Sequence, residues 1–423
     1  MPEASEFEPF IEDQQWFAEP QPFFCPACWE KFGLGSVMNI EANMGKEGDP
    51  VLGPGHAPRF WASNFNEDGI AIDPQGELSY DIACPHCRRK LPGGYCDTPH
   101  HIFSVIGAPG AGKSYYLSVL INELQSTLYK DFGVTFRDED PAGNVLLNEM
   151  KNQIFSAATR EEAILDKTTF EGKMYDQAVR RGRSVALPKP FVYTLSGKES
   201  ADHNASLIFY DNAGEHFQPN IDIEASPGAL HVAHSSVLLF LFNPASNPGF
   251  RKALSYVQDP QLRQQGVRDQ QDILLSEMEA RIKRLRNISA FNRVETPLAI
   301  IIGKADIWGR LIDWSQFKEP IVDGAISEPA IRHNSEILRE LLLEYASGIV
   351  ANAEALSSNV MYFAASAIGH SPELITEGPM EGYLAPDPRR IRPKFVDIPF
   401  LWALSKCEGN LVPSTQKEGG AHP

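Results

Sequence analysis

The chain has no long hydrophobic run. The longest apolar stretch is Val237–Phe242, which is far too short to span a bilayer and suits a buried strand. The first residues are acidic and lack the basic and apolar regions of a secretory signal. We therefore expect a cytoplasmic protein without a membrane span.

Positive charge is also scarce. The 423 residues include 38 Lys and Arg against 55 Asp and Glu, for a formal net charge of −17. This balance disfavours general binding to nucleic acid or to anionic membranes, so we expect no nucleic-acid partner. With 43% hydrophobic and 22% charged residues, the composition is that of a globular protein and excludes a wholly disordered one.

Cysteine is limited to six residues, which in a non-secreted chain does not indicate a disulfide framework. Four of them form two C-x-x-C pairs, Cys25 with Cys28 and Cys84 with Cys87. Each pair places two thiolates on one tight turn, and two such turns complete the tetrahedral sulfur site that zinc prefers. Residues 29–83 between the pairs exceed the usual spacing, which predicts an inserted lobe.

A closed site of four cysteines folds a small domain and does no chemistry, so we expect a structural role for this zinc. A surface for binding protein is the second interpretation. Cys96, with His100 and His101 nearby, is an alternative ligand set. These three are more simply residues of the linker into the next strand.

The composition changes near residue 99. Before it the chain is rich in Gly, Pro and aromatic residues without a helical period, and after it short apolar runs alternate with longer polar stretches. We predict a zinc-ribbon domain at 1–99, an α/β domain at 100–407 and a disordered tail at 408–423. The predicted strands are 102–106, 191–195, 207–210, 237–242, 297–302 and 360–364, and the predicted helices are 114–130, 269–286 and 334–356. The segment 133–187 shows no consistent period.

The strongest motif is GAPGAGKS at residues 107–114, a full G-x-x-x-x-G-K-S match between an apolar strand and an amphipathic helix. The glycines allow a tight turn that points backbone N–H groups at phosphate oxygens. Lys113 would reach the β- and γ-phosphates, and the Ser114 hydroxyl would bind Mg²⁺. The expected nucleotide-binding residues here are Gly107, Gly110, Ala111, Gly112, Lys113, Ser114 and Tyr115.

A second motif follows the strand 207–210, where Asp211 and Gly214 form Asp-x-x-Gly. An acidic residue at the carboxyl end of a strand beside the phosphate loop can hold Mg²⁺ through a water. The Gly214 N–H can bond the γ-phosphate and sense its presence. By itself the pattern is an ordinary exit from a strand, and its position after a phosphate loop favours the functional interpretation.

The third motif is Lys304-Ala-Asp306 after the strand 297–302. The Asp306 carboxylate can accept hydrogen bonds from N1–H and N2–H₂ of guanine, a donor pair that adenine lacks. The Lys304 stem can lie over the base. The next strand runs into Ser366 and Ala367, a small-residue turn whose backbone can contact guanine O6.

These motifs, in this order and each at a strand end, resemble those of Ras-like P-loop GTPases of the translation-factor-related (TRAFAC) class. The zinc ribbon, the long insertion before 191–195 and the segment Val396–Trp402 resemble the bacterial double-GTPase families. The resemblance implies a doubly wound, mostly parallel sheet that binds GTP or GDP with Mg²⁺. It also implies a protein partner, which is a second GTPase or an activating protein.

The chain departs from the family at three places. Gly303 stands where Asn or Thr is usual, which removes one tether between the base loop and the phosphate loop. Glu215 replaces the Gln that often orients water, so Lys113, Gly214 and Glu215 are expected to support only slow hydrolysis. No Thr for Mg²⁺ is obvious just before 191–195. The candidates are Ser184, Thr168 and Thr169.

The sequence therefore predicts a GTPase with low intrinsic activity that acts as a nucleotide-controlled switch. Two alternatives stay open. The first is a P-loop ATPase, for which Gly303 is the best support. The second is a zinc-ribbon scaffold or adaptor whose GTPase domain binds nucleotide but is catalytically weak.

Overall fold

One large sheet organises the computed structural model, which describes residues 23–45, 47–165, 175–180, 183–198, 204–211, 230–263 and 271–420. Among these residues, seven strands form the sheet in the order β18-β15-β14-β8-β13-β12-β9. Their bounds are β8 His100–Ile106, β9 Val134–Asp138, β12 Phe191–Gly197, β13 Asn204–Asp211, β14 Val237–Phe242, β15 Leu298–Ile302 and β18 Val360–Ala364.

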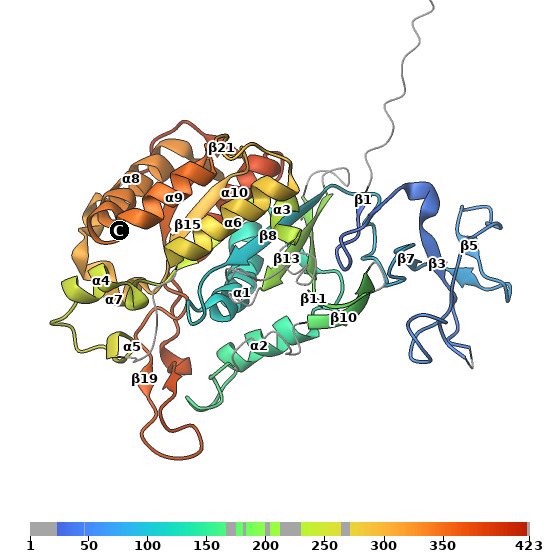
Figure 1. Ribbon diagram of the computed structural model, residues 1–423, viewed down its shortest axis with the longest axis horizontal. Coiled ribbons are helices and arrows are strands. Elements are labelled where there is room, and N and C mark those ends of the chain that lie inside the picture. The colour runs from blue at the N-terminus through green and yellow to red at the C-terminus, as the bar shows by residue number, and fades with distance from the viewer. Residues whose placement is uncertain are drawn as a thin grey trace, which may run out of the picture.

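Strand direction gives the sheet its class. The strands β13, β8, β14, β15 and β18 are parallel to one another. The strand β12 pairs antiparallel with β13, and β9 pairs antiparallel with β12. Helices cover the sheet on both faces (Figure 1). The predicted fold class, a doubly wound and mostly parallel sheet of the P-loop, Ras-like type, is confirmed.

The helices mostly follow the parallel strands. Their bounds are α1 Lys113–Phe132, α2 Val145–Phe155, α3 Leu230–His234, α4 Pro248–Ala253, α5 Pro260–Arg263, α6 Gln271–Leu285, α7 Ala305–Trp308, α8 Glu328–Tyr345, α9 Ser347–Leu356 and α10 Ile398–Cys407. Within the described part of the chain, none combines the length and apolar character needed to cross a bilayer.

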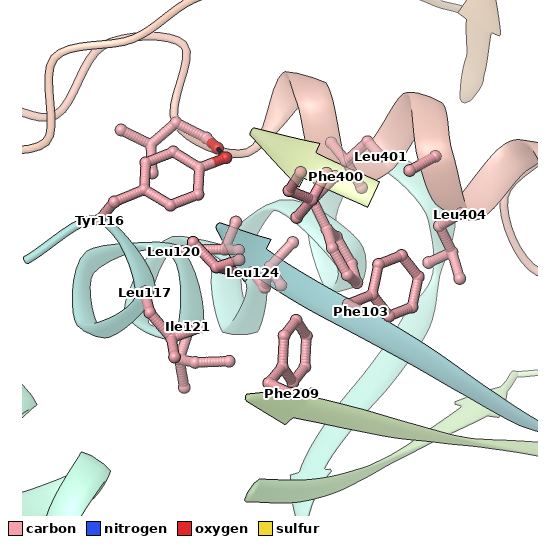
Figure 2. Close-up of a cluster of buried hydrophobic side chains, with 14 of the residues drawn as sticks. Phe103, Tyr116, Leu117, Leu120, Ile121, Leu124, Phe209, Phe400, Leu401 and Leu404 are labelled. Carbon is pink, nitrogen blue, oxygen red and sulfur yellow. Dashed lines mark hydrogen bonds between the residues drawn. The ribbon is translucent and has the colours of Figure 1, made fainter. Parts of the chain in front are cut away.

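The first face of the sheet packs against α1 and α10. The apolar stripe predicted on α1 is buried completely, through Leu117, Leu120, Ile121, Leu124 and Leu128. Figure 2 shows Phe400 of α10 pointing toward Phe103 of β8 and Phe209 of β13. The ring centroid of Phe400 lies 4.6 Å from that of Phe103 and 5.4 Å from that of Phe209. This aromatic group holds α10 onto the strands that carry the candidate site.

The second face has two different covers. Over β14 and β15, alternate residues such as Leu238, Phe240 and Ile300 pack with α6, α8 and α9. Over β8, β12 and β13, the cover is the N-terminal region, because Ile102, Val192 and Ile208 share one buried cluster with all four paired cysteines. The cysteine turns thus occupy a place beside the helices of this face.

Among the described residues up to 99, the regular elements are one 3-10 turn, Leu34–Ser36, and seven short strands. They are β1 Phe23–Phe24, β2 Lys31–Phe32, β3 Met38–Ile40, β4 Arg59–Phe60, β5 Ala71–Ile72, β6 Leu78–Ser79 and β7 Ile82–Ala83. The lobe between the cysteine pairs extends away from the large sheet (Figure 1). Arg88, next to the second pair, binds the buried carboxylate of Asp49 in that lobe at 2.7 Å.

The structure differs from the sequence prediction at the helix expected over 334–356. It is two helices, because Ala346 adopts φ −150° and ψ 49° between α8 and α9. The first of them begins earlier than predicted, at Glu328, where the Ser327 hydroxyl accepts a hydrogen bond from the Ala330 N–H. A Ser followed by Pro329 at the first turn is a usual helix start that the apolar pattern alone does not reveal.

The tail also differs from the prediction. Residues 408–420 do not extend freely, because Leu411 and Val412 are buried in the main core. The strand β21 (Ser414–Thr415) pairs with β17 (Ala325–Ser327), which itself pairs with β16 (Ile321–Val322).

The segment without a consistent period contains β9, α2 and the antiparallel strands β10 (Tyr175–Arg180) and β11 (Arg183–Pro188). A last pair, β19 (Glu373–Leu374) with β20 (Leu384–Ala385), follows β18.

Truncating the shared ring of α10 tests this packing. Phe400→Ala removes a fully buried side chain and leaves a cavity between three elements, so we expect it to lower the free energy of unfolding by about 3–5 kcal/mol. Phe291→Ala is the matched control, because that ring is 97% exposed and its loss should change stability little. Denaturant unfolding of both variants measures the difference. Equal stabilities would contradict the packing described.

Candidate nucleotide and metal sites

The loop between β8 and α1 has the backbone geometry of a phosphate-binding loop. A Cβ atom on Gly107 would lie 2.5 Å from the carbonyl oxygen of Leu241, so only glycine fits beside β14. Gly110 and Gly112 have φ of +77° and +91°, values that favour glycine. The Lys113 ammonium lies within the loop and donates to the carbonyl oxygens of Gly107 and Ala108, at 3.0 and 3.2 Å. This places a positive charge at the amino end of a long helix.

The Ser114 side chain meets the end of β13. Its hydroxyl donates to the Asp211 carboxylate at 2.6 Å, across 97 residues of sequence. Asp211 is 1% exposed and lies in register with Val105 on the adjacent parallel strand. A hydroxyl and a carboxylate side by side next to a phosphate loop are oxygen donors of the kind that Mg²⁺ selects. The two predicted magnesium residues are thus brought together.

Two predicted catalytic residues, Gly214 and Glu215, lie outside the described residues. The switch candidates Thr168 and Thr169 also lie outside them. Ser184 is on β11, where it pairs with Val179 of β10. The role of these residues stays a prediction from the sequence.

The predicted base-reading residues gather at the ends of β15 and β18. The Ser366 hydroxyl donates to one carboxylate oxygen of Asp306 at 2.5 Å, and the Gln261 amide donates to the other at 3.2 Å. The Ala305 N–H also donates to the Ala365 carbonyl at 3.0 Å, which joins the two loops through the backbone. Burial raises the pKa of Asp306, and the hydrogen bonds from Ser366 and Gln261 oppose that shift. The carboxylate is therefore fixed in position by its neighbours.

The base-reading loop is tied to the phosphate loop at Gly110. The Lys304 ammonium donates to the Gly110 carbonyl at 3.3 Å, and its backbone has a left-handed φ of 56°. Burial lowers the pKa of Lys304 to about 8, while Asp306 and Asp259 oppose the shift. The Asn243 amide also donates to the Gly110 carbonyl, at 3.3 Å. The bond from Asn243 is a second link to the phosphate loop. Gly303 in place of the usual Asn or Thr predicts the loss of one such link.

Gln271, at the start of α6, holds Asn243 in place. Its side chain accepts from the Asn243 N–H at 2.6 Å and donates to the Asn243 carbonyl at 3.1 Å. The Asn243 Oδ1 accepts from the Ala245 N–H, so its amide nitrogen is the atom that faces Gly110. Sequence reasoning missed Asn243, Gln261 and Gln271. The signal for Asn243 was its place directly after an apolar strand, whereas the glutamines come close only through the fold.

Two further predicted residues have clear surroundings. The Tyr115 hydroxyl donates to the Ala163 carbonyl and accepts from the Leu165 N–H, both at 2.9 Å. The Tyr115 side chain therefore contacts the segment that ends at Leu165. Its backbone lies in the first turn of α1, beside the phosphate loop. Ala367 is partly buried against the main core and directly follows Ser366.

The four paired cysteines form one compact cluster. All their sulfur atoms lie within 4.8 Å of one another, and every one of these residues is buried. The Cys25 and Cys87 sulfurs are 3.7 Å apart, and the Cys28 and Cys84 sulfurs are 3.8 Å apart. A tetrahedral zinc site with Zn–S bonds of about 2.3 Å requires sulfurs about 3.8 Å apart. The cluster could therefore hold a zinc ion.

The two cysteine turns have similar backbone conformations. The Ala27 N–H donates to the Cys25 sulfur at 3.4 Å, and the His86 N–H donates to the Cys84 sulfur at 3.3 Å. Such bonds stabilise thiolates. The residue after each pair, Trp29 or Arg88, is left-handed, with φ of 63° and 61°.

The alternative ligand set is not assembled. In the described ranges, Cys25, Cys28, Cys84 and Cys87 form the one group of three or more His, Cys, Asp or Glu side chains close enough to share a metal. His101 instead contacts Glu408 at 2.6 Å, and the ring of His100 stacks on Tyr95.

Comparison with known proteins finds a protein with a similar sequence. No family model matches the chain. It is 25% identical over 336 residues to SaeC of Mycolicibacterium smegmatis, described as a candidate ESX-1 scaffolding and assembly protein. The match covers 68% of this chain and 72% of that protein.

Three solved structures are also similar to this chain. They are a candidate nucleolar GTP-binding protein 1 from Plasmodium falciparum (14% identity, 66% of this chain and 82% of that one, TM-score 0.28), the small GTPase Arl6 from Trypanosoma brucei (11%, 73% and 96%, 0.27) and Era from Aquifex aeolicus (12%, 65% and 53%, 0.25). At these scores the overlap carries no argument. The fold assignment depends on the strand order and the phosphate loop.

Metal analysis of single cysteine variants tests the cluster. We expect about one zinc per chain in the wild type and a large loss in Cys87→Ser, because a serine hydroxyl is a poor substitute for a thiolate ligand. Cys96→Ser is the matched control and should keep its metal, since Cys96 lies outside the cluster. Elemental analysis of the purified proteins measures the content. Zinc retained in Cys87→Ser and lost in Cys96→Ser would reverse the assignment.

Proposed function

We propose that this chain is a Mg²⁺-dependent GTP-binding protein that hydrolyses GTP slowly and acts as a nucleotide-controlled switch toward a protein partner. One observation carries the proposal: Asp306 is fixed by Ser366 while Lys304, two residues earlier, contacts the phosphate loop at Gly110. A carboxylate for a base and a loop for phosphates are thereby held at one end of the sheet. This arrangement supports binding of a nucleotide with its base at Asp306 and its phosphates at the loop.

Guanine is the base that this arrangement favours. Its N1–H and N2–H₂ groups can replace the donor that Gln261 now presents to Asp306, while Ser366 keeps the other carboxylate oxygen. Adenine offers no such donor pair, so it would displace the Gln261 donor without replacing it. The raised pKa of Asp306 agrees with a group that gains from new donors.

The phosphates and the metal would bind at the opposite end of the site. Lys113 provides the cation, and the backbone from Gly107 to Tyr115 provides N–H donors at the start of α1. Ser114 and Asp211 provide oxygen donors for Mg²⁺, which would neutralise charge on the β- and γ-phosphates. The proposed catalytic set is Lys113, Gly214 and Glu215. A carboxylate at 215 is a poor partner for water beside a γ-phosphate, which is the reason for proposing slow hydrolysis.

The partner is proposed from resemblance alone. The double-GTPase families suggest a second GTPase or an activating protein that supplies an Arg to the transition state.

A scaffold function is the second candidate, and the similarity to SaeC favours it. In this version the chain binds nucleotide and organises other proteins but hardly hydrolyses GTP.

Single-turnover hydrolysis separates the two candidates. Conversion of bound GTP within minutes to hours supports the switch, and bound GTP that persists as long as the protein is folded supports the scaffold.

Calorimetric titration tests base selectivity. We expect tight binding of GDP and a non-hydrolysable GTP analogue with Mg²⁺, and binding of the matching ATP analogue weaker by at least about a hundredfold, because a lost buried hydrogen-bond pair costs about 3 kcal/mol. Asp306→Ala should remove this preference. Asp131→Ala, on the exposed end of α1, is the control and should bind like the wild type.

The titration has two contrary outcomes. Equal or preferred binding of the ATP analogue would indicate a P-loop ATPase, the alternative that Gly303 supports. Binding of neither nucleotide would contradict both candidate functions as stated and would leave a scaffold that acts without nucleotide.

A further inference from the structure

The first cysteine turn contacts the end of the strand that carries Asp211. Tyr210 directly precedes Asp211 and is fully buried. Its hydroxyl donates to the carbonyl of Pro26 at 2.6 Å, and Pro26 lies between Cys25 and Cys28. The first cysteine turn therefore contacts the residue that directly precedes the magnesium candidate Asp211.

Trp29 makes a second contact between the same parts. Its ring lies 5.1 Å from Tyr210, 5.8 Å from His231 and 6.2 Å from His234, where it stacks within 7° of parallel. His231 and His234 belong to α3, the described element that follows β13 in the chain. The first cysteine turn thus packs against both elements that flank residues 212–229, which are not themselves described.

The conformation of the first turn depends on the cluster. Trp29 has a left-handed φ of 63°, and its N–H donates to the Cys25 carbonyl at 3.0 Å. The turns at 25–28 and 84–87 are far apart in sequence and meet sulfur to sulfur. All four sulfurs lie within 4.8 Å of one another, and thiolates packed this closely would repel one another without a cation between them. Without that cation the two turns lose their shared centre.

Helix α3 is linked in turn to the strand of the phosphate loop. The Ser104 hydroxyl on β8 is 2.5 Å from Nδ1 of His231, and the His231 ring stacks on Tyr210 at 4.8 Å. Tyr210 is also in register with Ser104 across the parallel pair. A displacement of the cysteine turn would therefore reach Asp211 through β13 and the phosphate loop through α3 and β8.

We propose that the metal bound by Cys25, Cys28, Cys84 and Cys87 positions the carboxyl end of β13 and helix α3, and so links metal occupancy to Mg²⁺-nucleotide affinity. The inference rests on the proposed nucleotide function. Linkage is reciprocal: removal of the metal weakens nucleotide binding, and bound nucleotide strengthens metal binding by the same free energy. Couplings between sites are commonly about 5–150-fold, and we expect about tenfold here.

Hydrogen–deuterium exchange of the full chain tests the structural part without any nucleotide. Zinc-loaded protein is compared with protein treated with a chelator. We expect loss of protection at Asn204–Asp211 and Leu230–His234, with β15 and β18 unchanged. Unchanged protection at β13 and α3 overturns the proposal. Loss across the entire sheet also overturns it, because it would show that the metal holds the whole domain together rather than this edge.

Affinity for a fluorescent GDP analogue tests the linkage. The expected result is a dissociation constant about tenfold higher after zinc removal. Tyr210→Phe keeps the ring and loses only the hydroxyl that binds Pro26, so we expect full zinc content with part of that affinity loss. Tyr383→Phe, on an exposed loop, is the control and should change neither quantity.

The two failures are distinguishable. If zinc-loaded wild type binds no nucleotide, the proposed function fails, and the exchange experiment still decides whether the metal positions β13. If loaded and depleted proteins bind GDP equally, the linkage is overturned while nucleotide binding stands.

Discussion

The parallel pairing of β8 and β13 is the constraint on which the candidate site depends. Because parallel strands end at the same edge, the phosphate loop after β8 and Asp211 at the end of β13 meet, and Ser114 donates to Asp211 at 2.6 Å. The next strands, β14, β15 and β18, continue in the same direction and deliver Asn243, Asp306 and Ser366 to that edge. A different order of strands would separate these groups even with every motif intact.

The two faces of the sheet explain how β13 contacts both the main core and the cysteine turns. Alternate residues of β13 face opposite sides, so Phe209 packs with α10 while Tyr210 packs with the cysteine turns. The helices α6, α8 and α9 cover other parts of this face, whereas the cysteine cluster and α3 cover the end of β13. The residue directly before Asp211 is therefore packed against the N-terminal region.

Local signals predicted much of this architecture. The six predicted strands are continuous apolar runs or nearly so, and each overlaps a strand of the large sheet; α1 follows its apolar stripe. The edge strand β9 was missed although Val134 and Phe136 are buried in alternation, because five residues give a weak pattern. The ordered tail has a long-range cause, because β21 pairs with β17. So does the bond from Asn243 to Gly110, which joins residues 133 positions apart. Sequence patterns over a few neighbouring residues carry no information on contacts between residues this far apart.

The most direct test of the account concerns the metal at Ser114 and Asp211. Mn²⁺ can replace Mg²⁺ at oxygen sites and is detected by electron paramagnetic resonance. With GDP present, we predict one bound Mn²⁺ per chain, with affinity at least about tenfold lower in Ser114→Ala, because a direct oxygen ligand is lost. Ser118→Ala, a buried serine one turn later on α1, should bind Mn²⁺ like the wild type. Equal Mn²⁺ affinity in the wild type and Ser114→Ala would contradict the account, because the two strand ends would then not form a metal and phosphate site.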